Sequence, residues 1–337
     1  MRVESPPSAL FAGDALWPSA WRESSGEATL KARMGVADAE LTIYSSWFCP
    51  FAQRAWIAAE EKGVNYVWEE VNPYEVDEGA PGGYSKKQVP LDRKRASNPS
   101  FVAASPRGLV PAIDCEGELL CESDPIIEYI DGKFPGKGAT LCPADPYLRA
   151  RCRIYADFAN QKIQRPYYRM LIEQSEEARA AAYADLLAGI KEFAGAMSTE
   201  GPFFLGNDFS FTDVSFAPFY QRILWVGAAY RGVQIPTTGD PALERMHQWW
   251  QAVSQRDSVK KTLVCEDRLV ASYSNYAENK ATSDYAKSMM SSLSATTRNS
   301  AALASSSSSL TSRPALLAGI AFIAGLAIGF GAPRGPK

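Results

Sequence analysis

The chain contains 337 residues, enough for about two domains of ordinary size. Its 35 basic and 38 acidic residues nearly balance, so no overall positive charge favours nucleic acid as a partner. The six cysteines show neither a CxxC pair nor zinc-ligand spacing. The one histidine, His247, lies in a helix-like segment where we expect a structural or surface role, which argues against a metal site and against Cys–His or Ser–His–Asp hydrolases. A reducing, cytosol-facing compartment fits this cysteine usage.

Residues 1–40 contain no secretory apolar segment and are treated as an N-terminal extension. Residues 41–135 alternate strand-like and helix-like patterns, which predicts an α/β domain. The predicted strands cover residues 41–44, 65–71, 110–113 and 119–121, and the predicted helices cover residues 50–63 and a segment that begins near residue 124. Residues 72–100 are rich in Gly, Pro, Lys and Arg and predict an inserted loop.

Long helical patterns follow a linker at residues 136–144 and predict an all-α domain over residues 145–274. Four helix starts can be placed from capping residues. They lie at Asp145-Pro146, at Ser175, at Ser210-Phe211-Thr212-Asp213 and at Asp240-Pro241. The third is a variant of the capping box, flanked by Phe209 and Val214 as a hydrophobic staple.

Residues 275–313 are polar and rich in serine, which predicts a disordered linker. The following Ala315–Ala332 segment has eighteen residues without a charge, and as a helix it would be about 27 Å long. We predict a transmembrane tail anchor over residues 314–333 that holds a cytosol-facing body on an intracellular membrane. The alternative is an apolar tail on a cytoplasmic protein.

Cys49 is the most informative residue, because it stands where a predicted strand gives way to a predicted helix. Pro50 follows at the first helical position, so Cys49 is expected at the N-cap. Free backbone N–H groups and the positive end of the helix dipole favour a thiolate there, which predicts a pKa lowered from about 8.5 to roughly 3.5–7.5. The alternative is a buried and inert core thiol.

The pattern over residues 41–270 resembles the cytosolic glutathione transferases, in particular the cysteine-type omega and lambda classes. Four elements in the same order carry the resemblance. They are Cys49-Pro50-Phe51-Ala52-Gln53-Arg54, Gly108-Leu109-Val110-Pro111-Ala112, Glu122-Ser123 and Ser210-Phe211-Thr212-Asp213. The resemblance implies a thioredoxin-like glutathione-binding domain at residues 41–135, followed by the helical domain. It also implies glutathione as co-substrate and, as in many relatives, a homodimer.

The resemblance assigns further residues to the glutathione site. It implies a cis peptide bond before Pro111 that turns the backbone of Val110 towards the cysteinyl part of glutathione. Glu122 and Ser123 would receive the γ-glutamyl end, where a helix N-terminus favours a carboxylate. Phe51 is expected to shield the cysteine or to pack in the core. Omega-type enzymes also use a lysine upstream of the Val-Pro pair, and the nearest cations here are Lys94 and Arg95.

The acceptor substrate would lie against aromatic residues of the helical domain. Tyr155, Phe158 and Trp225 are the predicted pocket residues, with Tyr167 and Tyr168 also available. The implied function is glutathione-dependent thiol transfer, such as deglutathionylation or dehydroascorbate-type reduction, through a mixed disulfide of Cys49. Two alternatives stay open: a membrane-associated non-enzyme, similar to the intracellular chloride channel proteins or to tail-anchored organelle factors, and a redox sensor.

Overall fold

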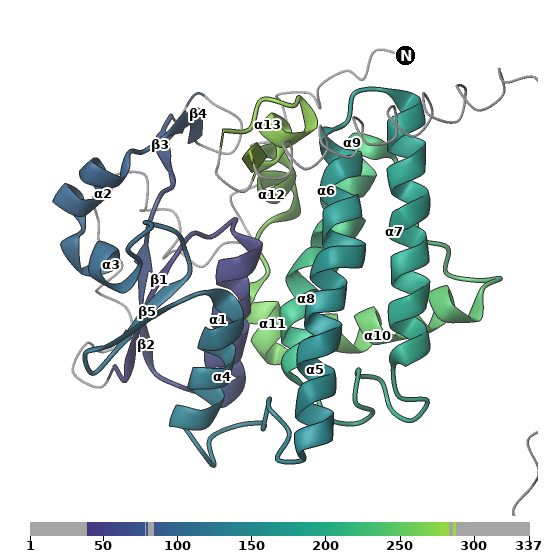
Figure 1. The fold of residues 1–337 in the computed structure, drawn as a ribbon, viewed down its shortest axis with the longest axis horizontal. Helices are drawn as coiled ribbons and strands as arrows, with labels where there is room; N and C mark the ends of the chain where they lie inside the picture. Colours follow the sequence, from purple (N-terminus) through teal and green to yellow (C-terminus); the bar gives the residue numbers. More distant parts are fainter. Residues whose placement is uncertain (1–38, 78, 80–83, 283–285, 288–337) are drawn as a thin grey trace, which may run out of the picture. The chain divides into compact units, whose positions relative to one another are not determined.

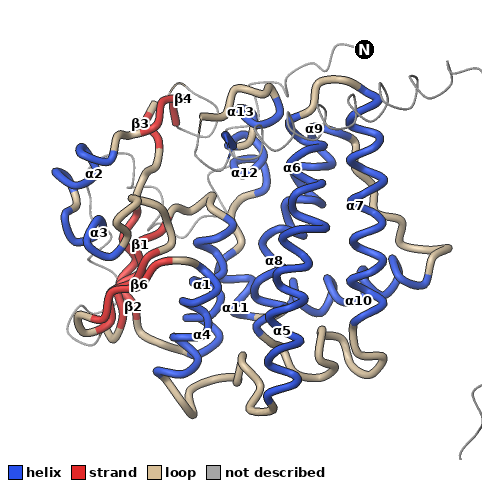
Figure 2. Tube along the Cα trace, viewed as in Figure 1, coloured by secondary structure: helices blue, strands red, loops and turns tan. Residues whose placement is uncertain are grey.

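A computed structural model of the protein describes residues 39–77, 79, 84–282 and 286–287. The strands are β1 (Leu41–Ser45), β2 (Tyr66–Glu70), β3 (Tyr74–Val76), β4 (Tyr84–Gln88), β5 (Ala112–Cys115) and β6 (Glu118–Cys121). The helices before residue 140 are α1 (Pro50–Lys62), α2 (Leu91–Ser97), α3 (Pro99–Ala104) and α4 (Ser123–Lys133). Figures 1 and 2 show their arrangement.

Within the described residues, four strands form a mixed sheet in the order β2-β1-β5-β6. Strand β1 pairs in parallel with β2 and antiparallel with β5, and β5 continues antiparallel into β6. Helices α1 and α4 lie on one side of the sheet, between it and the helical domain, and α3 lies on the other side (Figure 1). This is the thioredoxin-like arrangement implied by the sequence. It places the N-terminus of α1 at the edge of the sheet domain that faces the helical domain.

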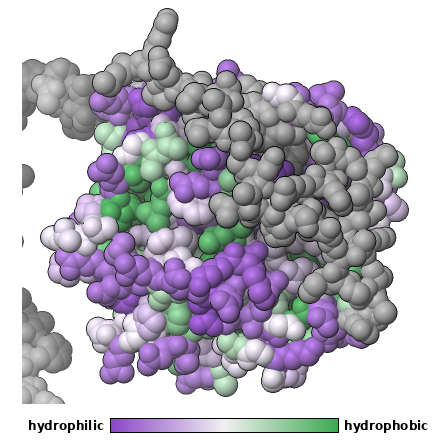
Figure 3. All heavy atoms as spheres, turned by 180° about the vertical axis from the view of Figure 1, so that it is seen from behind, coloured by the Kyte–Doolittle hydropathy of each residue, from purple (hydrophilic) through white to green (hydrophobic). Residues whose placement is uncertain are grey.

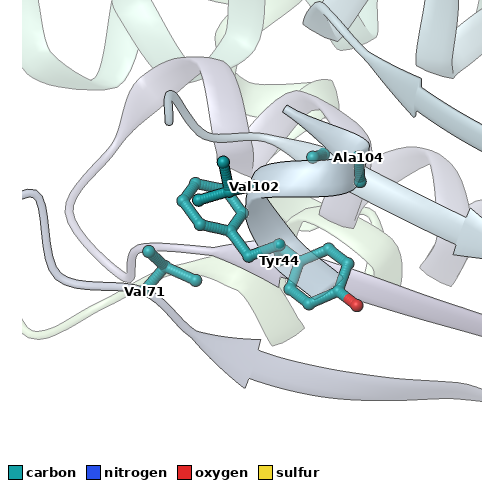
Figure 4. Packing of buried hydrophobic residues seen from close by; sticks show 6 residues of the cluster. Tyr44, Val71, Val102 and Ala104 are labelled. Carbon is teal, nitrogen blue, oxygen red and sulfur yellow. The ribbon is translucent and has the colours of Figure 1, made fainter. Parts of the chain in front are cut away.

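An apolar cluster fixes the α3 side of the sheet. It contains Tyr44 from β1, Val71 beyond β2, and Phe101, Val102 and Ala104 from α3 (Figure 4). The rings of Tyr44 and Phe101 lie 5.7 Å apart at an interplanar angle of 47°. Burial of a large apolar side chain stabilises a fold by about 1.5–3 kcal/mol. The cluster therefore anchors the segment after α3, which leads directly into the Val110-Pro111 turn.

The predicted loop at residues 72–100 was wrong in part, because the described portion contains the β3–β4 hairpin and helix α2. In β3, Tyr74 and Glu75 are half-buried and Val76 is exposed, so these residues lack the alternating apolar pattern by which strands are predicted. Ion pairs join Glu75 to Lys87 and Arg93. The ring of Tyr74 stacks on Phe48 at 6.2 Å, so the insertion packs next to the loop that carries Cys49.

The helical domain is built around long helices that run side by side (Figure 1). It contains α5 (Pro146–Ala159), α6 (Arg165–Ile172), α7 (Glu176–Ala196), α8 (Phe211–Arg222), α9 (Ala228–Arg231), α10 (Pro241–Gln255), α11 (Asp257–Thr262), α12 (Glu266–Ser272) and α13 (Ser274–Ala277), with π-helical turns η5 (Asn160–Gln164) and η6 (Ile223–Gly227). All four predicted helix starts are confirmed by side-chain caps at Asp145, Ser175, Ser210 and Asp240.

Helix α13 extends past residue 274, where the sequence pattern placed the start of a linker. No helix in the described ranges is long and apolar enough to cross a membrane. The predicted anchor at residues 314–333, most of the 275–313 linker and residues 1–38 lie outside the described residues, so these assignments stay predictions. Seen from behind, the described surface is largely hydrophilic, with smaller apolar patches between polar residues (Figure 3).

Asp213 ties the capping box to the core of the helical domain. Its buried carboxylate accepts hydrogen bonds from Ser210 N at 2.9 Å, Phe204 N at 2.9 Å and Trp249 Nε1 at 2.7 Å. Asp213→Ala would leave these buried donors without an acceptor, at a cost of about 3–5 kcal/mol. We expect a large drop in the urea midpoint, measured by circular dichroism. Asp208→Ala at the exposed neighbouring turn is the control and should change it little; equal effects would contradict this role.

Candidate active site

A cavity of about 530 Å³ lies where the sheet domain meets the helical domain. Its volume is within the range of ligand pockets in proteins. One wall comes from the sheet domain: Phe48, Cys49, Pro50, Phe51, Val71, Pro73, Tyr74, Gln88, Ser105, Arg107, Gly108, Leu109, Val110, Pro111, Cys121, Glu122 and Ser123. The other wall comes from the helical domain: Tyr168, Ser272, Tyr273, Asn275 and Tyr276. The cavity therefore brings together Cys49, Phe51, Val110, Pro111, Glu122 and Ser123, which the sequence assigned to one site.

Cys49 is the N-cap of α1, and Pro50 begins the helix as predicted. The Cys49 amide donates to the carbonyl of Ser46 at 2.9 Å, and the Cys49 carbonyl accepts from Gln53 N at 3.0 Å. Cys49 Sγ lies 3.9 Å from the carbonyl oxygen of Val110, which precedes the cis Pro111. The thiol thus faces the backbone segment that the sequence placed opposite it.

The expected lowering of the Cys49 pKa by the helix N-terminus was wrong in direction. Burial raises the pKa of the Cys49 thiol above its usual value. The backbone N–H groups of Ala52 and Phe51 and the guanidinium groups of Arg222 and Arg54 all act to lower it, and together they do not offset the loss of solvation. The sequence shows the helix start but not the depth at which the sulfur lies.

Ser123 and Glu122 meet at the start of α4. The buried Ser123 hydroxyl accepts a hydrogen bond from Arg54 Nη1 at 3.1 Å, and the same nitrogen contacts Asp124 Oδ1 at 3.2 Å. Since Arg54 acts as the donor, the hydroxyl proton of Ser123 is left to point towards an acceptor in the cavity. Glu122 has a backbone φ of 74° and an exposed side chain. This corner therefore offers a hydroxyl donor, a helix N-terminus and a carboxylate.

Arg107 is a cavity residue that the sequence analysis missed. Its guanidinium pairs with the Glu122 carboxylate, and the two side chains are 67% and 58% exposed. An exposed ion pair of this kind contributes little to stability, so the pair can open for a ligand at low cost. Its position three residues before Val110, in the same turn, is the sequence feature that could have placed it near the cavity.

The cations proposed from the resemblance do not line this cavity. Lys94 is buried, and its Nζ donates to the carbonyl of Gly108 at 2.9 Å. Arg95 is exposed on α2 and is likewise absent from the cavity wall. Lys94 instead supports the backbone that leads into Val110-Pro111. Among the described residues, the cation that lines the cavity is Arg107.

The aromatic wall of the cavity also differs from the prediction. Tyr155 is half-buried and packs against other rings of the helical domain, with its ring centroid 5.9 Å from that of Phe158 and 5.1 Å from that of Phe204. Neither Tyr155, Phe158 nor Trp225 of η6 lines the cavity. Tyr168 does line it, together with two residues from the C-terminal helices: its ring lies 6.5 Å from that of Tyr273 and 5.4 Å from that of Tyr276. Helical spacing alone does not show which aromatic face turns inward.

The raised pKa predicts how alkylation of Cys49 depends on pH. Because the thiolate is the reactive form, its rate with iodoacetamide should rise with pH through a midpoint above that of a small free thiol, about 8.5. Peptide mass spectrometry of the ligand-free protein measures the rate at Cys49, and N-acetylcysteine in the same buffers is the reference. A midpoint at or below that of the reference would contradict the burial of the thiol.

Comparisons with known proteins agree with this geometry. Residues 48–133 match the N-terminal domain of glutathione S-transferases, and residues 160–262 match their C-terminal domain. Protein IN2-1 homolog A of Oryza sativa subsp. japonica is 31% identical over 232 residues, covering 66% of this chain and 84% of the rice protein. The chloroplastic glutathione S-transferase L2 of Arabidopsis thaliana is 29% identical, covering 71% of each chain.

Among solved structures, glutathione transferase Omega 3C from Trametes versicolor is 30% identical, with a TM-score of 0.59. The match covers 72% of this chain and 93% of the fungal chain. Glutathione is the co-substrate of these enzymes. The chain belongs to the glutathione S-transferase family.

Proposed function

We propose that this protein is a glutathione-dependent thiol transferase of the cysteine type, which removes glutathione from mixed disulfides and reduces small oxidised acceptors. The observation that carries the proposal is the cysteine at the N-cap of α1, with its sulfur in the cavity and 3.9 Å from the Val110 carbonyl oxygen. A cysteine there can bond covalently to the glutathione sulfur, which a hydroxyl group cannot do under the same conditions. The 30% identical omega-type neighbour supports this choice.

The polar corner of the cavity orients glutathione. The γ-glutamyl carboxylate would accept from the Ser123 hydroxyl and from the N-terminus of α4, while Glu122 or its partner Arg107 meets the remaining charges. The backbone of Val110 would pair with the cysteinyl residue, as the family resemblance implies. These contacts bring the glutathione sulfur towards Cys49 Sγ, which lies 3.9 Å from the Val110 carbonyl.

The reaction then takes two exchange steps. The Cys49 thiolate attacks the glutathione sulfur of a mixed disulfide, the substrate sulfur leaves as a thiolate and takes a proton from solvent, and a Cys49–glutathione disulfide remains. A second glutathione thiolate attacks this disulfide at the glutathione sulfur, releases glutathione disulfide and restores the Cys49 thiolate. Each unit by which the pKa of Cys49 is raised reduces the fraction of thiolate at neutral pH about tenfold. The thiolate itself becomes about threefold more nucleophilic for each pKa unit, which offsets part of this loss.

Other cavity residues would contact the acceptor substrate. The cavity wall also has aromatic surface, from Phe48, Tyr74, Tyr168, Tyr273 and Tyr276. Aromatic rings favour apolar or planar groups next to the scissile disulfide. We therefore expect better turnover of glutathione disulfides that carry an aromatic group than of those that carry a charged one.

The two non-catalytic alternatives are less well supported. A membrane-associated binding protein would not need the cysteine in the same cavity as the Val110-Pro111 turn and Glu122-Ser123. A slow redox sensor would need these residues, but it would not need an aromatic wall for an acceptor. The predicted membrane tail is compatible with an enzyme, since a linker would separate it from the folded body. Turnover rates separate the enzyme from the sensor.

Cys49→Ala is expected to lower the rate of glutathionylated-peptide reduction at least 100-fold, because it removes the nucleophile. Cys49→Ser should lose thiol transfer equally but retain glutathione binding, measured by calorimetry. The control is Cys265→Ala, an exposed cysteine outside the cavity wall, which should keep the wild-type rate. Equal rates for Cys49→Ala and wild type would refute the proposed function.

Glu122→Gln tests the γ-glutamyl corner. It removes a carboxylate from the cavity rim without a large change in shape, and a charged hydrogen bond contributes about 1.5–3 kcal/mol. We expect KM for glutathione to rise roughly 10- to 100-fold with a smaller change in kcat. Steady-state kinetics measure both, with the exposed Glu200→Gln far from the cavity as the matched control. An unchanged KM would contradict a contact between the Glu122 carboxylate and glutathione.

A further inference from the structure

Arg222 is a fully buried guanidinium, at 0% exposure, at the last position of α8. Its Nη2 donates to the carbonyl of Phe48 at 3.0 Å, one residue before Cys49. Its Nε donates to the hydroxyl of Tyr273 at 2.8 Å, and its Nη1 donates to Gln53 Oε1 at 2.8 Å and to Pro218 O at 2.7 Å. One side chain thus contacts the Cys49 loop, helix α1 and the turn between α12 and α13, where Tyr273 lines the cavity.

All of these partners are neutral. Within the described residues, no carboxylate forms an ion pair with Arg222. A buried charge without a counter-ion costs several kcal/mol, even when its hydrogen bonds are satisfied. Arg54, the other buried arginine near Cys49, differs in this respect because Asp124 Oδ1 lies 3.2 Å from its Nη1. The positive charge of Arg222 therefore favours any anion that forms close to it.

Cys49 is the group beside Arg222 that can form such an anion. The Arg222 charge lowers the pKa of the thiol against the larger effect of burial, and it also lowers the pKa of Tyr273. Two guanidinium groups act on Cys49, those of Arg222 in α8 and Arg54 in α1. Among the described residues, the other charged or titratable groups that line the cavity are Tyr74, Arg107, Cys121, Glu122, Tyr168, Tyr273 and Tyr276. Arg54 is already paired with Asp124, and Glu122 is paired with Arg107 at the exposed rim.

We propose that Arg222 is the counter-ion of the Cys49 thiolate and so a positioning residue for the thiol-transfer reaction. The proposal rests on the proposed function for its use of the thiolate, but the charge pairing itself does not require turnover. It assigns the activation of Cys49 to a residue of the helical domain, 173 positions away in the sequence, in addition to the N-terminus of α1.

The pairing has a consequence for the reaction cycle. In the Cys49–glutathione disulfide the sulfur is neutral, so Arg222 loses its counter-ion. When the second glutathione attacks, Cys49 leaves as a thiolate and regains the interaction. A stabilised leaving thiolate departs faster, so Arg222 should accelerate the second exchange step as well as the first. The same guanidinium also donates to the Tyr273 hydroxyl.

The test compares Arg222→Met, Arg222→Lys and wild type. The pH profile of Cys49 alkylation by iodoacetamide, followed by mass spectrometry, requires neither glutathione nor turnover. We expect Arg222→Met to shift the midpoint upward by at least one unit and to lower the rate at pH 7 at least tenfold. Arg222→Lys keeps the charge but cannot make the same set of hydrogen bonds, and it should restore most of the reactivity.

Arg245→Met is the matched control, since Arg245 also donates to backbone carbonyls without an ion-pair partner among the described residues, at Pro202 and Phe203, away from the cavity. It should leave the pH profile unchanged. If Arg222→Met folds, by circular dichroism, and keeps the wild-type midpoint, the proposal is overturned. If Arg222→Lys loses reactivity as fully as Arg222→Met, the role of Arg222 is structural and the proposal is also overturned. Wild-type protein and variants that give the expected alkylation profiles, but a wild-type protein without thiol-transferase turnover, would instead count against the proposed function.

Discussion

Arg54 and Arg222 cross the boundary between the sheet domain and the helical domain in opposite directions. Arg54 leaves α1 and donates to the carbonyl of Ser215 at 2.7 Å and to Asn160 Oδ1 at 2.7 Å. Arg222 leaves α8 and donates to the carbonyl of Phe48. A buried guanidinium loses its hydration and must find protein acceptors for its donors, so each arginine fixes the distance between the domains. These two contacts help to hold the cavity together, because its walls come from both domains.

This constraint also explains how one helix serves several purposes. Helix α1 packs against the sheet on one side and against α8 and α11 on the other, and its N-terminus opens into the cavity at Cys49. Gln53 and Arg54, one turn further along, carry the contacts to the helical domain. Arg54 also donates to Ser123, so the proposed γ-glutamyl corner is held from the same helix. The position of the thiol, this corner and the packing of the domains therefore depend on a single turn of helix.

Local signals in the sequence predicted much of this and failed where burial decides. The N-cap at Cys49 and the caps of the helical domain depend on neighbouring residues, and the structure confirms them. The direction of the Cys49 pKa shift was wrong, because solvation at the sulfur depends on segments far away in the sequence. Tyr155 was placed in the acceptor pocket although it packs against Phe204 away from the cavity wall, while Arg107 was overlooked. A helical pattern shows a buried stripe but not which cavity, if any, the stripe faces.

The proposed reaction passes through a disulfide between Cys49 and glutathione. Rapid mixing of the full-length protein with a glutathionylated peptide, followed by acid quench and intact-mass and peptide analysis, measures how fast Cys49 gains one glutathionyl group. We expect this adduct to form at least as fast as the enzyme turns over. Added glutathione should then remove the adduct at the turnover rate. Turnover without the adduct, or with an adduct formed more slowly than product, would contradict the account.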